Sequence, residues 1–337
     1  MFRSQILFIS RSRIASVITA ILLNAIGVAV MVGVSLESFQ LYGWVIFVLT
    51  PSILGFNTAL LYSLGQKRSV GSTAALSCVS LLVVALAILI FAIEGLICLI
   101  MVLPIALPLC LLGAYIGHFT ANCINRRYLK VLTSAVLLAV TPLLTALEAQ
   151  RTVSLPSSKV TTSIEVNCAV DKVWKLIPEF SAITSEPVLI FKAGIAFPLS
   201  CRMEGSGIGA RRFCELSTGS MTETITAWNP PYHLAFDVLK TPPSMREISF
   251  YNNFHPPHIE GFYVSKKGEF RLTSLPNGRT RIDGTSHYEN RLWPESYWLP
   301  ISDFVVRQVQ LRVLNHIKTL SESTPALTPD SNSSSPQ

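Results

Sequence analysis

The side chains that could take part in acid–base chemistry are scattered in this sequence rather than grouped. No spacing among them places a nucleophile next to a base that would activate it. Residues of a strand alternate between its two faces, so the predicted strand Arg279–Glu289 carries His287 on the solvated face and Tyr288 on the inward face. The sequence therefore assigns no catalytic residue and predicts Tyr288 as a pocket residue. The full set of proton-transfer candidates is His233, His287, Tyr288, Glu289 and Arg291.

Two short motifs look like ligand sites but are better explained as a loop and a turn. His255-Pro-Pro-His258 offers two imidazoles, but the prolines fix an extended spacing and no cysteine or carboxylate cluster follows to complete a metal shell. Gly205–Gly209 has three alternating glycines, yet strands are predicted on both sides, whereas phosphate loops join a strand to a helix. We predict no metal and no cofactor, a rigid loop at His255–His258, and a hairpin turn at Gly205–Gly209.

Cysteine usage bears on the compartment of the protein. Cys201 and Cys214 are symmetric about the glycine turn, so in a regular hairpin they face each other. A disulfide between them requires a location outside the cytoplasm. Two free buried thiols remain the alternative, because a bulge in the turn would shift the register.

The composition indicates a membrane protein. Half of the 337 residues are hydrophobic and only 14% are charged, which is too apolar for an ordinary soluble chain. A cleaved signal peptide would explain only the first of five apolar runs. Each run is near the ~20 residues that cross a bilayer core. The runs are Ile14–Val34, Tyr42–Leu64, Thr73–Ile93, Leu96–Phe119 and Leu129–Leu147.

The charges around these runs predict their orientation. Cationic loops stay on the cytoplasmic side, and the Lys and Arg residues of this half form three clusters, whereas Glu37, Glu94 and Glu148 occupy the alternate connections. With the N-terminus in the cytoplasm, five crossings place everything after Glu148 outside it. If the short and partly polar fifth run lies on the surface instead, the remainder becomes cytoplasmic. The clusters are Arg3, Arg11 and Arg13; Lys67 and Arg68; and Arg126, Arg127 and Lys130.

The five runs predict an anchor rather than an ion path. No Asp, Glu, Lys or Arg lies well inside any of them, and such groups ordinarily mark ion paths and proton relays. Asn24, Asn57 and the prolines of the runs are assigned to helix packing and kinking rather than to a cavity. His118 is assigned to the membrane interface.

The second half predicts an α+β domain. A polar linker, 150–159, leads to a strand at Val160–Ala169 and a short helix capped by Asp171. An apolar stripe with a helical period then predicts a long last helix from Ile301 to Leu320, with Gln310 among the polar residues between the apolar ones. The expected organisation is a membrane domain at 1–149, a folded domain at 160–321 and a disordered tail at 322–337. Further strands are predicted at Leu199–Glu204, Arg211–Ser217, Met221–Trp228, His233–Leu239, Lys267–Leu275 and Arg279–Glu289.

Three stretches resemble the SRPBCC superfamily of START-like and polyketide cyclase/dehydrase-like proteins. They are EGSGIGARRFCELSTGSMTETITAWNPPYHLAF (Glu204–Phe236), KGEFRLTSLPNGRTRIDGTSHYENRLWPESYW (Lys267–Trp298) and VVRQVQLRVLNHIK (Val305–Lys318). They are similar to a largely uncharacterised bacterial branch, which implies the inner membrane of a bacterium. The resemblance covers about 160–320 and implies a helix-grip fold, a curved antiparallel sheet around a long C-terminal helix. It says little about function, because such folds carry enzymes and carriers alike.

The resemblance further implies a ligand cavity between the sheet and the last helix. An apolar hollow with a few polar groups is the usual form of a small-molecule site. A core filled by the same side chains is the alternative. The expected ligand-binding residues are Phe236, Phe270, Leu272, Ile282, Tyr288, Val309, Val313 and His316.

Three functions remain open from the sequence. The favoured one is a membrane-anchored module that holds a lipid or other hydrophobic small molecule beside the bilayer. The second is a cyclase- or dehydratase-like enzyme on polyketide or aromatic substrates, and the third is an interaction or sensor domain with a filled core. Nucleic acid is not an expected partner, because the charges of the second half nearly balance and form no basic stripe.

Overall fold

The computed structural model describes residues 13–33, 42–64, 66–150, 157–251, 254, 256 and 259–323. The chain forms two compact units. The first holds the N-terminal helices together with Met245–Tyr263 and Asn290–Ile301, and the second holds the remaining described residues from Ser157 onward. The His255–His258 motif, the centre of the predicted linker and the predicted tail lie largely outside the described residues.

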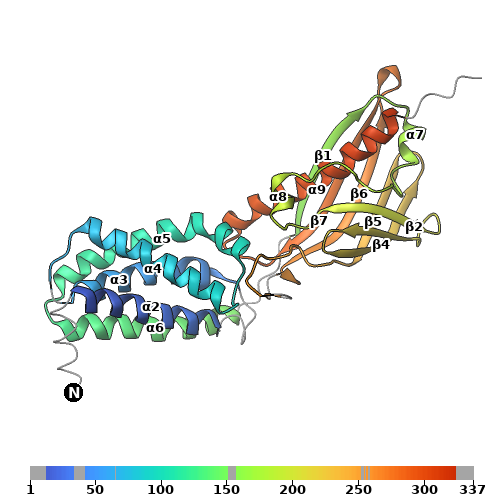
Figure 1. Ribbon diagram of the computed structural model, residues 1–337. Coiled ribbons are helices and arrows are strands. Elements are labelled where there is room, and N and C mark those ends of the chain that lie inside the picture. The colour runs from blue at the N-terminus through green and yellow to red at the C-terminus, as the bar shows by residue number, and fades with distance from the viewer. Residues whose placement is uncertain are drawn as a thin grey trace, which may run out of the picture. The chain divides into compact units, whose positions relative to one another are not determined.

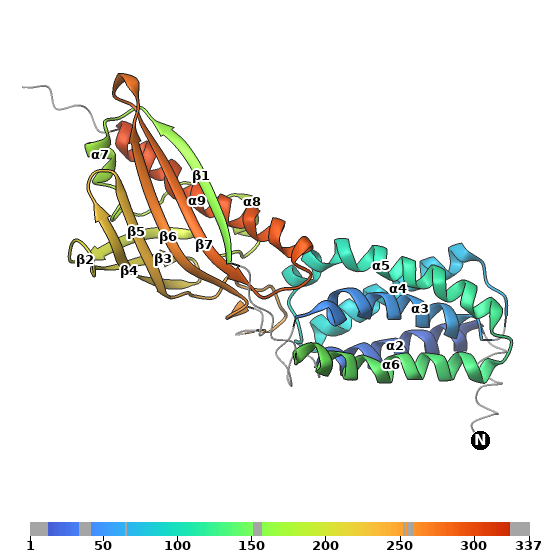
Figure 2. The same cartoon turned by 180° about the vertical axis from the view of Figure 1, so that it is seen from behind.

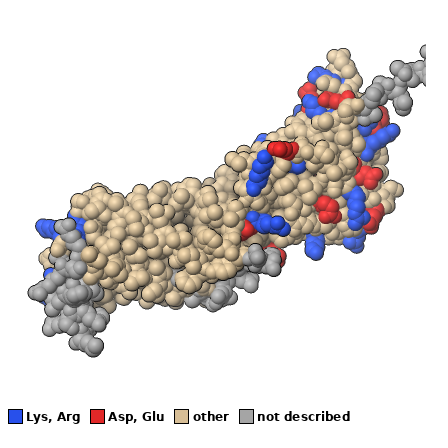
Figure 3. All heavy atoms as spheres, in the orientation of Figure 1, with Lys and Arg blue, Asp and Glu red and all other residues tan. Residues whose placement is uncertain are grey.

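The first unit is a bundle of helices (Figures 1 and 2). Among the described residues, five helices are long and apolar enough to cross a membrane, as the five apolar runs predict. The fifth extends over Arg127–Ala149 and is longer than the run from which it was predicted. Figure 3 shows little charge along most of the visible face of this bundle. The helices are α2 (Arg13–Gly33), η2 (Val45–Leu49) continued by α3 (Thr50–Tyr62), α4 (Val70–Ile90), α5 (Leu96–Cys123) and α6 (Arg127–Ala149).

Glycines allow α3 and α5 to approach closely. A Cβ atom built on Gly113 would lie 2.0 Å from the carbonyl oxygen of Ser52, and one built on Gly55 would lie 1.9 Å from that of Cys110. Small residues let apolar helices pack backbone against backbone, where dispersion contacts hold them together. This crossing is therefore available only to glycine at both positions.

Asn24 and Asn57 are packed inside the bundle, as expected. Asn24 donates from Nδ2 to Thr58 Oγ1 at 2.9 Å, and Asn57 is buried. Neither lines the cavity of about 120 Å³ that lies among α2 to α5, but Pro51 does, so the expectation that the prolines border no cavity is wrong for Pro51. His118 is buried and its Nδ1 lies 3.4 Å from Thr73 Oγ1, so its ring packs between helices, and its assignment to the membrane interface stays a prediction.

The second unit contains a curled antiparallel sheet in the order β1-β7-β6-β5-β4-β3-β2. From β2 to β7, strands that follow one another in the chain are neighbours in the sheet, and β7 also pairs with β1 (Figure 2). The Pro276–Gly278 turn joins β6 to β7, and Asn277 and Gly278 adopt positive φ there. The strands are β1 (Ser157–Val166), β2 (Pro198–Glu204), β3 (Arg211–Leu216), β4 (Gly219–Asn229), β5 (His233–Lys240), β6 (Tyr263–Ser274) and β7 (Thr280–Asn290).

The last helix, α9 (Glu295–Ser323), lies along this sheet (Figure 1). It begins six residues before the predicted start at Ile301. Pro300 therefore lies inside the helix instead of before it. Leu314 and Ile317 of α9 are fully buried against Leu234 and Ile282 of the sheet. A curved antiparallel sheet that holds one long helix is the helix-grip arrangement, so the predicted fold class is confirmed.

Two short helices, α7 (Val170–Trp174) and α8 (Leu189–Lys192), complete the unit. The prediction that Asp171 caps α7 is wrong. Ala169 is the N-cap residue and makes no side-chain cap, and Asp171 lies inside the first turn. A carboxylate in the first turn still interacts favourably with the positive end of the helix dipole.

Candidate functional site

A cavity of about 100 Å³ lies between the sheet and α9. Aromatic side chains of neighbouring strands and aliphatic side chains of the helix line it, so its wall is mostly apolar. Ligand sites in proteins are typically apolar hollows that contain a few placed polar groups. The lining includes Phe180, Met221, Phe236, Phe270, Val309, Val313 and Leu314, together with the polar residues Arg212, Glu223 and Gln310.

The structure brings together four of the eight residues predicted to bind ligand. Phe236 and Phe270 line the cavity from β5 and β6, with their ring centroids 6.4 Å apart. Val309 and Val313 line it from α9. Strand alternation and helix periodicity placed these side chains on facing surfaces.

The other four predicted residues do not line this cavity. Leu272 and Ile282 belong to the close-packed core. Tyr288 is fully buried and donates from its hydroxyl to Asp303 Oδ1 at 2.6 Å. His316 lies on the outer part of α9, where its Nε2 is 3.1 Å from the carbonyl oxygen of Ser181. Hydrogen bonding and packing within the fold account for all four.

The cavity wall also contains a buried ion pair that was not predicted from the sequence. Arg212 on β3 and Glu223 on β4 face each other in the strand register. Arg212 Nη1 donates to Glu223 Oε2 at 2.6 Å, and both side chains are almost completely inaccessible to solvent. The sequence did contain a signal, because Arg212 alternates in phase with Cys214 and Glu223 in phase with Ile225.

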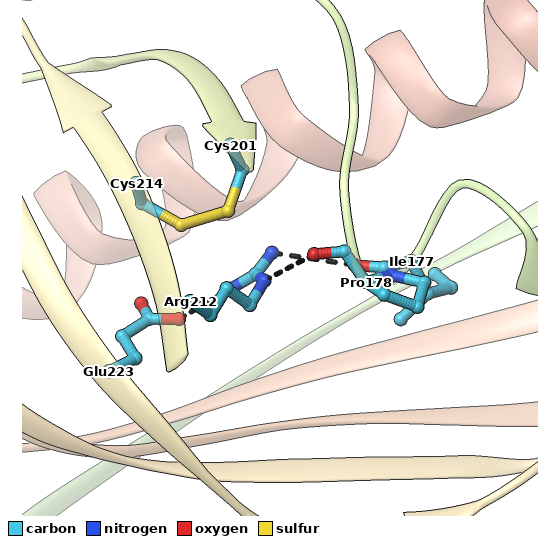
Figure 4. Close-up of polar contacts among 6 residues, drawn as sticks. All are labelled: Ile177, Pro178, Cys201, Arg212, Cys214 and Glu223. Carbon is cyan, nitrogen blue, oxygen red and sulfur yellow. Dashed lines mark hydrogen bonds and ion pairs between the residues drawn. A yellow bond between two sulfur atoms is a disulfide. The ribbon is translucent and has the colours of Figure 1, made fainter. Parts of the chain in front are cut away.

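Arg212 is held by several further groups (Figure 4). Its Nε donates to the carbonyl oxygen of Pro178 at 2.8 Å, and Nη2 lies 3.4 Å from that of Ile177. The guanidinium carbon also lies 5.1 Å from the ring centroid of Phe236 and 5.7 Å from that of Phe270. A planar guanidinium suits such combined hydrogen bonding and stacking, so its position in the wall is fixed.

Glu223 is less completely satisfied than its partner. Its Oε2 accepts from Arg212, but Oε1 has no hydrogen-bond partner among the described residues. Burial raises the pKa of Glu223, and the nearby Arg212 only partly opposes this effect. An unpaired buried acceptor is energetically unfavourable. Glu223, a residue of the cavity wall, therefore carries a buried acceptor that no described residue satisfies.

Gln310 is a further polar residue of the wall, which also includes Glu269, Thr285 and Ser286. The sequence places it among the polar residues of the helix, but in the structure it is buried against the sheet. Its Nε2 donates to the carbonyl oxygen of Val160 and to Ser286 Oγ, both at 3.0 Å. Its Oε1 accepts from Thr162 at 2.6 Å. These bonds tie α9 to β1 and β7 beside the cavity.

The acid–base candidates named from the sequence lie in other arrangements. His233 Nε2 is 3.1 Å from Glu269 Oε2, and Arg271 also pairs with this carboxylate. Burial acts to raise the pKa of Glu269, but the hydrogen bonds from His233 and Arg271 outweigh it, so the pKa is lowered. Glu289 pairs with Lys266 at 3.1 Å. The charged candidates His233 and Glu289 are therefore members of ion pairs, and these pairs include no nucleophile.

A disulfide joins Cys201 to Cys214 beside the ion pair (Figure 4). The two residues are direct partners in the β2–β3 register. The irregularity in this hairpin falls between Pro198 and Ser200, not in the glycine turn. The alternative of two free thiols is therefore wrong, and Gly205–Gly209 forms the predicted hairpin turn.

Comparison with known proteins gives structural likeness alone. No protein-family model and no curated protein matches the chain. Among solved structures, a protein from Nitrosospira multiformis is 20% identical, with 49% of this chain and 97% of that one covered and a TM-score of 0.30.

Two structures of named enzymes also match. The ZhuI aromatase/cyclase of a Streptomyces species is 16% identical, covering 50% of this chain and 94% of that one at a TM-score of 0.33. A truncated norcoclaurine synthase from Thalictrum flavum is 10% identical, covering 52% and 99% at a TM-score of 0.32. Such low scores carry no argument about ligand or activity, and the fold assignment rests on the strand order and α9.

Proposed function

We propose that this chain is a membrane-anchored module of the SRPBCC type that binds a hydrophobic small molecule carrying one hydrogen-bond donor. The observation that supports this most directly is a mostly apolar cavity with Glu223 in its wall, whose Oε1 has no hydrogen-bond partner among the described residues. Apolar walls favour the body of the ligand, and the carboxyl oxygen selects a hydroxyl or similar donor. A lipid with a polar end fits this description.

The size of the cavity limits what it holds in this conformation. About 100 Å³ is comparable to an engineered apolar cavity of roughly 150 Å³ that binds benzene. A ring or a short chain segment fits. A whole lipid requires displacement of α9 from the sheet, so the natural ligand is either small or enters by one end.

Small probes test this proposal in the full-length protein. Phenol and toluene are similar in size, but only phenol has a donor for Glu223. We expect phenol to raise the melting temperature more than toluene, because a ligand that binds the folded state stabilises it by mass action. The Arg212→Met/Glu223→Met double variant should lose this preference.

A cavity-filling variant provides the control. Val309→Phe leaves both charged residues in place but occupies the hollow, so it should respond to neither probe. Equal responses of wild type and Val309→Phe would contradict binding in this cavity. Equal responses of wild type to phenol and toluene would contradict the role of Glu223.

A second candidate is cyclase- or dehydratase-like catalysis on aromatic or polyketide substrates. It is favoured by the raised pKa of Glu223, because a carboxyl group whose pKa is raised by burial is better suited to act as a general acid or base. Turnover of a poly-β-ketone thioester that Glu223→Gln abolishes would support it. No turnover by the wild type would leave binding as the function.

We also propose that the sheet unit lies outside the cytoplasm. The cationic clusters support this orientation under the positive-inside rule, and the Cys201–Cys214 disulfide supports it because disulfides persist in oxidising compartments. A reporter that is active only outside the cytoplasm, fused after Ser323, should be active. Signal from a cytoplasmic reporter alone would reject this orientation.

A further inference from the structure

A short segment of the β5–β6 connection is bonded to the ends of two membrane-type helices. The backbone N–H of Leu96 donates to the carbonyl oxygen of Ile248 at 3.0 Å. The N–H groups of Ile97 and Cys98 donate to the two carboxylate oxygens of Glu247, each at 3.0 Å. Glu247 is buried and satisfies the first turn of α5, whose N–H groups have no partner within the helix.

The same segment also reaches the end of α4. The hydroxyl of Tyr251 donates to the carbonyl oxygen of Ile90, which is the last residue of that helix. Residues 246–251, here called the collar, therefore join the C-terminal end of α4 to the N-terminal end of α5. Both helices are long and apolar enough to span a membrane.

The collar exposes apolar and aromatic side chains at this level. Phe250 is 73% exposed, and Ile248 and Tyr251 are about half exposed. Phe91, in the connection between the two helices, is 73% exposed as well. Arg246 is exposed beside them. Trp and Tyr are enriched where a membrane meets water, and basic side chains there reach lipid phosphates.

We propose that the collar lies in the headgroup layer of the bilayer, on the side opposite the cationic Lys67–Arg68 connection. Phe250 and Ile248 contact the outer part of the acyl chains, and Arg246 contacts lipid phosphates. The lipid surface is the occupant, because the collar continues the lipid-facing surface of α4 and α5 through direct hydrogen bonds. This inference rests on the proposal that these helices span a membrane.

Tryptophan quenching in lipid nanodiscs tests the depth of the collar. The full-length Phe250→Trp variant is compared with Leu82→Trp, which places the probe at a 62% exposed position in the middle of α4. The tryptophan emission of the parent protein is subtracted from that of each variant. The measurement is made in lipids brominated near the glycerol end or near the methyl end of the acyl chain.

We expect bromine near the glycerol end to quench Phe250→Trp more strongly, and bromine near the methyl end to quench Leu82→Trp more strongly. Quenching of Leu82→Trp alone would overturn the collar proposal and leave the membrane anchor intact. That result would favour a protein partner for the exposed aromatic residues. No quenching of either variant would overturn both proposals.

Discussion

At the residue scale, the ion pair of Arg212 and Glu223 is the least expected feature of the domain. Burying two charges is unfavourable unless each is compensated, and the attraction between them often only offsets the loss of hydration. Arg212 has carbonyl oxygens and two aromatic rings around it as well as Glu223. The charge of Arg212 is thus well compensated, whereas Glu223 Oε1 has no partner among the described residues.

Replacing one partner of this pair should lower the free energy of unfolding far more than replacing both. Arg212→Met leaves the Glu223 carboxyl buried without compensation, and breaking a buried pair in this way costs about 3–5 kcal/mol. The Arg212→Met/Glu223→Met double variant should be closer to wild type. Denaturant unfolding of the full-length protein in detergent measures both.

Arg211→Met is the matched control, because Arg211 is the neighbouring residue on the exposed face of β3. It should change stability by no more than about 0.5 kcal/mol. A single Arg212→Met variant as stable as this control would contradict the structural role given to the pair.

The stability of the fold should depend on pH through Glu223. Burial raises the pKa of this group above its ordinary value of 4.5, so the folded state holds the proton more tightly than the unfolded state. The contribution of Glu223 to the free energy of unfolding is therefore complete below pH 4.5, and it is lost as the pH rises through the pKa of the folded state. The unfolding free energy of wild type relative to Glu223→Gln should therefore decrease with rising pH.

Glu269→Gln should show the opposite trend, because the pKa of Glu269 is lowered. Its contribution is present at higher pH and is lost as the pH falls through the folded pKa. A wild-type advantage over Glu223→Gln that grows with pH would show that Arg212 outweighs burial at this site.

At the element scale, local periodicity was sufficient for most of the fold. Alternation located every strand to within a few residues, and the symmetry of Cys201 and Cys214 about the glycine turn gave their register. The polar residues turned inward were missed: Gln310 was placed with the polar residues of the helix because of its type, and no face of their strands was assigned to Arg212 and Glu223. The hydrogen-bond partners of these residues lie on other elements, and the periodicity of one element does not identify partners on another.

The close crossing of α3 and α5 makes a prediction for glycine substitution. Gly113→Ala should destabilise the bundle by about 1–3 kcal/mol, as overpacking does, because the added Cβ would meet the Ser52 carbonyl oxygen at 2.0 Å. Unfolding in mixed micelles, followed by helical circular dichroism, measures this effect.

Gly71→Ala in the first turn of α4 is the control, since nothing lies within 4 Å of a Cβ atom there. Alanine is the better helix former by about 1 kcal/mol, so this variant should be neutral or slightly stabilised. If both variants behave alike, the close approach of the two helices is not what Gly113 provides.

At the scale of the whole molecule, the units are not continuous in sequence. The boundary predicted at the linker is one of several points at which the chain changes from one unit to the other. Two later segments, Met245–Tyr263 and Asn290–Ile301, also belong to the unit of the N-terminal helices. The first of these segments shows neither helical nor strand periodicity, so the sequence offered no reason to separate it from the sheet. Unit membership depends on contacts between distant residues, which local patterns do not report.

This organisation predicts that the sheet unit stays with the membrane after the linker is cut. With a protease site inserted at residues 150–156, cleavage separates Ala149 from Ser157, yet the later fragment still carries Glu247, which accepts from Ile97 and Cys98. It also carries Trp298, whose ring centroid lies 5.1 Å from that of Phe47. Several buried contacts of this kind should hold the fragment through a high-salt wash, which screens only exposed charges. Immunoblotting of pellet and supernatant should therefore find residues 157–323 in the pellet until detergent is added, whereas their appearance in the supernatant after cleavage alone would mean that the linker is the only effective attachment.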